Sequence, residues 1–167
     1  MLVSVAKHVD VTELIRLVTG RTLSSSVQLQ LHVSIAAAVL SDPVQNWLDF
    51  VWSQLSGEDG MGVLELIAAR CRNTPSKHSI ILGQTRAVID ILGSLYISHI
   101  FQHSEGSPTQ EAVHVAIVRV AKAWMDLASS SHGGEAYLLL WAESRIFQQG
   151  ILALADINSV SMMVTPD

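Results

Sequence analysis

The residues best suited to chemistry are histidines around a predicted turn between two helices. His99 and His103 lie four positions apart and so share one face of a helix. Glu111 and His114 follow the turn, and imidazole nitrogens with a carboxylate oxygen are ligands that zinc accepts. The chain has no His-Glu-x-x-His motif, and its single cysteine, Cys71, is distant in sequence. A three-ligand site at the turn stays open as an alternative, but we expect no metal and no other cofactor.

A second chemical candidate is the segment 130–134, whose sequence is Ser-Ser-His-Gly-Gly. A serine nucleophile needs a strand–turn–helix elbow and an acidic side chain that orients its histidine. The flanking sequence predicts helices on both sides, and no aspartate is suitably placed. The glycine-rich motifs that bind phosphate groups are also missing. We therefore expect a flexible interhelical loop, no enzymatic activity and no small-molecule substrate.

The tryptophans are the remaining candidates, and all lie on apolar faces of predicted helices: Trp47, Trp52, Trp124 and Trp141. Buried tryptophan contributes a large apolar area to a core. Tryptophan is also enriched among the residues that dominate the energy of protein–protein interfaces. The pattern favours the core and leaves an interface role open, most of all for Trp141, which follows a leucine run.

The element that organises these residues is a helical hairpin predicted over 79–128. Its return arm starts clearly, because Ser107 can cap the helix and Pro108 suits its first position. Apolar residues then repeat at intervals of four and three: Val113, Ile117, Val120, Trp124 and Leu127. The outgoing arm carries apolar residues at helical spacing: Ile81, Val88, Ile91, Leu92, Leu95 and Ile100. Only residues 102–106 separate the arms, so the arms should run antiparallel.

Both arms are apolar on more than one side, so a hairpin alone cannot bury them. Either other helices of this chain cover the hairpin or a second copy does. Two hairpins packed together would make a four-helix bundle.

The rest of the chain predicts shorter helices and no convincing strand. The expected helices cover residues 12–18, 27–40, 44–55, 63–72, 135–149 and 151–163, with a turn at 57–62. The longest linkers have about six residues, too few to separate domains. We therefore predict one all-α domain over residues 1–167, in which shorter base helices flank the hairpin.

The composition favours a chain that buries surface against other proteins. Of its 167 residues 49% are hydrophobic and only 15% are charged, against a usual charged fraction of about 25%. This deficit favours an obligate oligomer over an ordinary helical monomer. The net charge of −5, without a basic block, argues against nucleic-acid binding by these residues alone. A single cysteine, no signal peptide and no predicted membrane span indicate an intracellular protein.

Several short segments follow one another in an order and spacing that a known family shares. They are Thr12–Ile15, Ser26–Val27, Ser41–Pro43, Trp47–Trp52, Val113–Ala123, Leu138–Trp141 and Thr165–Pro166. On these segments the chain resembles the core (capsid) protein of hepadnaviruses. The resemblance is closest to their non-enveloped fish-virus relatives, the nackednaviruses.

The resemblance implies a viral capsid subunit without catalytic activity. In that family a hairpin forms a spike, and two hairpins pack as a four-helix bundle in the dimer. The residues implied to line this dimer interface are Val88, Leu92, Leu95, Val113, Ile117, Val120, Trp124 and Leu127. The C-terminal base helices, residues 135–163, would join dimers into an icosahedral shell around the viral genome through Trp141, Ile146, Phe147 and Leu152. The implied location is the virion, with assembly in the host-cell cytoplasm.

The chain also departs from the family. It is longer between Pro43 and Trp141, so residues 44–78 are expected to form an added helical layer, and the choice of hairpin stays open. Cys71 lies outside the hairpin, so the family's spike disulfide has no counterpart here. The arginine-rich tail that binds the genome is absent, so nucleic-acid binding is not expected of these residues. The alternative is a soluble helical-bundle adaptor or regulatory protein that forms a small oligomer.

Overall fold

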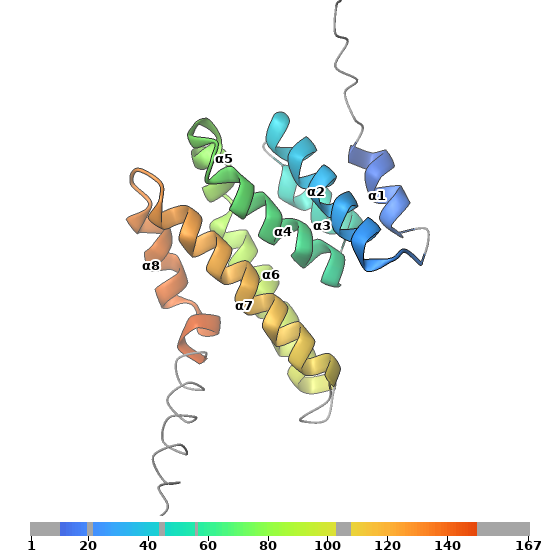
Figure 1. The fold of residues 1–167 in the computed structure, drawn as a ribbon. Helices are drawn as coiled ribbons and strands as arrows, with labels where there is room; N and C mark the ends of the chain where they lie inside the picture. The colour runs from blue at the N-terminus through green and yellow to red at the C-terminus, as the bar shows by residue number, and fades with distance from the viewer. Residues whose placement is uncertain (1–10, 20–21, 44–45, 56, 103–107, 150–167) are drawn as a thin grey trace, which may run out of the picture.

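The computed structural model describes residues 11–19, 22–43, 46–55, 57–102 and 108–149, which form helices and short turns, with no strand among them. The elements are α1 (Val11–Thr19), α2 (Ser25–Ser41), α3 (Trp47–Gln54), α4 (Gly57–Cys71), the 3₁₀ turn η1 (Pro75–Lys77), α5 (His78–Leu82), α6 (Thr85–Gln102), α7 (Pro108–Ser129) and α8 (Glu135–Glu143). The predicted all-α fold is confirmed (Figure 1). The helix predicted over 151–163 lies outside the described residues.

Helix α4 lies at the centre of the fold. It packs against α2 on one side and against α7 on the other (Figure 1). Because it has neighbours on both sides, most of its apolar residues are buried, and five of them are fully covered: Val63, Leu64, Ile67, Ala68 and Cys71. The segment 44–78, expected as an added layer, therefore supplies the helix around which the others pack.

The turn predicted over 57–62 is wrong, because α4 already begins at the first of these residues. The glycines in this segment provide space for neighbouring chains. A Cβ atom at Gly60 would collide with the carbonyl oxygen of Leu55, and one at Gly62 would lie 2.9 Å from Nδ1 of His32. The glycines therefore allow α2 and the end of α3 to approach the first turns of α4, at the expense of helix propensity.

Helices α6 and α7 form an antiparallel hairpin whose far end extends beyond the other helices (Figure 1). Pro108 opens α7 as expected, while its expected cap, Ser107, lies outside the described residues. The outgoing arm begins at Thr85 and not at Ser79. The Thr85 hydroxyl donates to the carbonyl oxygen of Leu82 at 2.6 Å, and the chain bends by 54° between α5 and α6.

The helix predicted over 135–149 is interrupted at Ser144. Helix α8 ends at Glu143, Ser144 has an extended ψ of 145°, and residues 145–149 are helical again. The backbone N–H of Phe147 donates to the Ser144 hydroxyl at 3.3 Å. Ser144 therefore caps a new helical turn, which explains why the helix does not continue straight through.

Tryptophan rings form the middle of the core. The rings of Trp47 and Trp124 stack with 6.3 Å between centroids and 16° between planes. The indole N–H of Trp124 donates to the carbonyl oxygen of Leu64 on α4 at 3.2 Å. Trp47, Trp124 and Trp141 are at most 2% exposed, so their predicted core role is confirmed, while Trp52 is half-buried.

Candidate functional site

The hairpin residues implied by the resemblance to line a dimer interface lie inside the single chain. Those that are at most 5% exposed are Val88, Leu92, Val113, Ile117, Val120, Trp124 and Leu127. Leu95 is half-buried. A second copy cannot reach the seven buried side chains without opening the fold, so a contact through the hairpin must use other residues. The four-three spacing could not reveal this, because it suits a seam within one chain as well as a seam between copies.

The side of α7 that faces away from the core is exposed and partly apolar. Val115 is 51% exposed and Val118 is 63% exposed, and the two lie three positions apart on this side. Glu111 and Lys122 continue the same stripe before and after them, and both are exposed. We call these four residues the outer face of α7. Sequence reasoning counted the two valines among the apolar residues outside the seam, because the polar stripe of this helix is narrow, but it did not assign them to an interface.

A groove runs between α4 and α7, beside the outer face of α7. Its two parts have volumes of about 240 Å³ and about 320 Å³. Small residues of both helices line it: Gly62, Ala69, Ala112, Ala116 and Ala123. Glu65 of α4 and Arg119 of α7 line both parts, and their ion pair, 3.2 Å long, crosses the groove. The small side chains leave room for another helix to approach closely.

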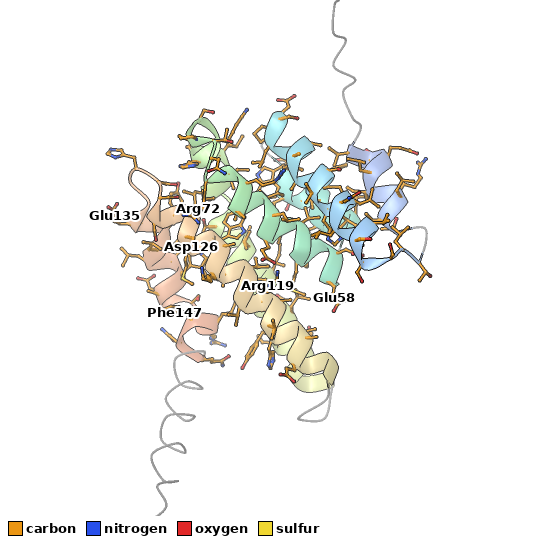
Figure 2. All side chains as sticks on the ribbon, in the orientation of Figure 1. Glu58, Arg72, Arg119, Asp126, Glu135 and Phe147 are labelled. Carbon is orange, nitrogen blue, oxygen red and sulfur yellow. The ribbon has the colours of Figure 1, made fainter. Side chains whose placement is uncertain are left out.

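Both sides of this groove carry charges of both signs. Glu58 and Glu65 lie on the α4 side together with Arg72, and Arg119 and Lys122 lie on the α7 side together with Asp126. Lys122 also pairs with Asp126 on its own helix at 2.7 Å. Figure 2 labels Glu58, Arg119 and Asp126 on this face of the molecule. A surface that carries charges of both signs can be complementary to itself after a two-fold rotation.

The residues expected to join dimers are in part buried. Trp141 is 1% exposed, Ile146 and Phe147 are half-buried, and Leu152 lies outside the described residues. The exposed large apolar residue of α8 is Leu139, at 62%. Four consecutive apolar residues of a helix point in different directions, so they cannot all face the protein core. The run Leu138–Trp141 could therefore have indicated that one of its residues, such as Leu139, is exposed.

The histidines around the hairpin turn are only partly described. Within the described residues no group of three His, Cys, Asp or Glu side chains is placed to hold a metal ion. His103 and the side chain of His99 lie outside them. The ring of His114 packs on Tyr96, with 5.1 Å between centroids, and its Nε2 is buried without a hydrogen-bond partner. The zinc alternative therefore stays a hypothesis.

Ser131, one of the two serines of the 130–134 loop, contacts a histidine that the sequence did not suggest. The Ser131 hydroxyl lies 2.8 Å from Nδ1 of His78, not beside its neighbour His132 in a catalytic pair. The Nε2 of His78 lies 2.9 Å from the carbonyl oxygen of Cys71. Residues 78 and 131 are 53 positions apart, so no local motif could reveal the contact.

Among the described residues no single helix is both long enough and apolar enough to cross a membrane. The segments Pro75–Leu82 and Thr85–Ser98 reach the necessary length and apolar character only when they are taken together, and they are bent by 54° relative to each other. Comparisons with protein-family models, with curated proteins and with solved structures gave no match.

Proposed function

We propose that this chain is a capsid subunit of the hepadnavirus-like type. It dimerises through the α6–α7 hairpin, and its dimers assemble into an icosahedral shell around a viral genome. The observation that carries this proposal is the outer face of α7, where Val115 and Val118 are exposed on a hairpin that extends beyond the other helices (Figure 1). The assembly of dimers into an icosahedral shell is proposed from the family resemblance. The proposal includes no catalysis, metal or cofactor.

The exposed valines alone are too few to hold a dimer together. Full burial of a valine is worth about 1.5–3 kcal/mol. A dimer contains four of these valines, two from each copy, so covering their exposed halves contributes roughly 3–6 kcal/mol. Association costs about 4–15 kcal/mol in lost rotational and translational freedom. A stable dimer must therefore also cover the groove between α4 and α7, and so reach the ~1,200–2,000 Å² of a standard interface.

The charged rims of the groove support a second copy as the occupant. When the outer face of one α7 lies over the groove of the other copy, Arg119 and Lys122 approach Glu58 and Glu65 of that copy. The opposite charges Arg72 and Asp126 line only one of the two parts of the groove. Exposed ion pairs add little to affinity. They do exclude orientations in which like charges meet, so they select one register for the dimer.

The proposed contacts between dimers lie at the base, at and after α8. Leu139 is exposed, Ile146 and Phe147 are half-buried on the next turns, and Trp141 supports them from the core. The contacts are individually modest and are multiplied by the symmetry of the shell. Nucleic-acid binding is not assigned to the described residues. The proposed location is the virion, with assembly in the host-cell cytoplasm.

Sedimentation velocity of Val118→Asp tests the dimer. A carboxylate in the middle of the outer face should prevent dimer formation and shell assembly, yet leave a folded monomer because Val118 is 63% exposed. Leu29→Asp is the matched control, since Leu29 is 56% exposed on α2, and this variant should dimerise like the parent. A Val118→Asp chain that dimerises and assembles normally would contradict the interface. Trp124→Ala is no substitute, because it would damage the core.

The alternative function is a helical-bundle adaptor that uses the same face in a small oligomer. Its particles would stop at a few chains at every protein concentration, because a closed small assembly leaves no free interface. Uniform megadalton particles support the capsid subunit instead.

A further inference from the structure

His78 connects three elements at the end of the fold opposite the hairpin tip (Figure 1). Its Nε2 lies 2.9 Å from the carbonyl oxygen of Cys71, the last residue of α4. Its Nδ1 lies 2.8 Å from the hydroxyl oxygen of Ser131, in the turn between α7 and α8. That hydroxyl oxygen also lies 2.7 Å from the carbonyl oxygen of Leu127 on α7. One imidazole and one hydroxyl thus join the last turns of α4 and α7 to the start of α5.

The hydrogens available for these three contacts depend on the charge of His78. A carbonyl oxygen only accepts, so Nε2 must carry the hydrogen in the contact with Cys71. In the neutral ring Nδ1 is then an acceptor, and the single hydroxyl hydrogen of Ser131 serves either Nδ1 or the Leu127 oxygen. In the imidazolium Nδ1 donates to the hydroxyl oxygen, and the hydroxyl donates to Leu127. Only the protonated ring satisfies all three contacts.

We propose that His78 and Ser131 form a proton-operated latch, which holds the turn between α7 and α8 firmly when His78 is charged and less firmly when it is neutral. The charge suits its place, because the carbonyl ends of α4 and α7 carry partial negative charge. Helix α8 begins at Glu135, directly after the turn, so the latch controls how firmly the start of α8 is held. This inference is independent of the proposed capsid function.

The other ionisable groups at the ends of the elements that the latch joins, or close to it in sequence, are Arg70, Arg72, Lys77, Asp126, His132 and Glu135. Asp126 is paired with Lys122 at 2.7 Å. Burial raises the pKa of the Cys71 thiol to about 11, so the thiol stays neutral where imidazoles titrate, between about pH 5 and 8. The other imidazole on these elements is that of His132, which is exposed.

The sign of the effect follows from the extra hydrogen bond. Protonation of His78 adds this bond only in the folded chain, so it stabilises the latched turn. This gain in the stability of the turn is present at acidic pH, and it is lost as the pH rises through the range in which imidazoles titrate.

Hydrogen exchange at the Gly134 amide measures the latch, because this N–H donates to the carbonyl oxygen of Ser131 at 3.1 Å. In the full chain, after correction for the intrinsic exchange rate, its protection at about pH 5.5 should exceed that at about pH 8 by about threefold or more. Ser131→Ala should remove this difference. The matched control His132→Gln removes the neighbouring exposed imidazole and should keep it.

Two results would overturn the latch. One is equal protection at both pH values, or a pH difference that survives in Ser131→Ala. The other comes from ¹⁵N NMR of the imidazole rings: the neutral His78 ring should carry its hydrogen on Nε2. A hydrogen on Nδ1 would mean that the donors and acceptors are arranged differently.

Discussion

At the scale of single residues, two helical glycines show how the surroundings decide the effect of the same substitution. A Cβ atom at Gly62 would lie 2.9 Å from the ring of His32, which is 8% exposed. That ring is held in place, because its Nε2 lies 2.9 Å from a carboxylate oxygen of Asp59. A Cβ atom at Gly93 in α6 would meet nothing within 4 Å.

Gly62→Ala and Gly93→Ala are therefore expected to act in opposite directions. Gly93→Ala should raise the free energy of unfolding by about 0.4–1 kcal/mol, because it restricts the unfolded chain without a clash. Gly62→Ala gains as much in helix propensity, but its added methyl group would push against the fixed His32 ring. Overpacking of this kind costs about 1–3 kcal/mol. Urea denaturation of both variants measures the difference. Two stabilised variants would mean that the His32 ring can move freely.

The buried thiol gives a prediction about alkaline pH. Burial raises the pKa of Cys71 from its ordinary value of 9.0 to about 11. The folded chain thus holds this proton more tightly than the unfolded chain, and the stability that it contributes is lost as the pH rises from about 9 to about 11. Urea denaturation at several pH values should show a smaller alkaline loss for Cys71→Ala than for the parent. Equal losses would show that other groups cause the effect.

At the scale of elements, the break after α8 depends on one serine. Ser144→Ala removes the hydroxyl that accepts from the Phe147 N–H, and loss of such a cap costs about 0.5–2 kcal/mol. Faster hydrogen exchange confined to residues 145–149 is the expected result. Ser34→Ala is the control, because the exposed Ser34 hydroxyl donates within α2 to Gln30 and caps nothing. Unchanged exchange at 145–149 would contradict the capping role of Ser144.

Local sequence signals predicted most of the helices but not how they pack. Pro108 and the four-three spacing located α7 well, because these signals act within a few residues. The same spacing could not tell whether α4 or a second copy would cover the seam. Gly60 and Gly62 suggested a turn, whereas their function is close approach to residues of other elements, which only the tertiary structure reveals.

The candidate sites also divide into those that local sequence signals could predict and those that only the tertiary structure reveals. The valines of the outer face of α7, Val115 and Val118, were within reach of sequence reasoning, because their positions on the helix place them opposite the apolar seam. The contact between His78 and Ser131 was not within reach, because it joins residues 53 positions apart through the folded chain.

At the scale of the whole molecule, the chain has its own core and also exposed surface that a partner could cover. Its tryptophan core lies within one copy, so a folded monomer is expected to precede assembly. Exposed apolar side chains lie on more than one element, among them Val118 on α7 and Leu139 on α8. This distribution fits a subunit with more than one kind of contact, as shell assembly requires.

The most direct test of this account is sedimentation velocity of the unaltered chain at moderate salt, with negative-stain images of any fast species. The account predicts dimers in equilibrium with uniform megadalton particles, whose share rises with protein concentration. A species of a few chains that stays unchanged at high salt and high concentration would contradict the capsid function and favour the adaptor.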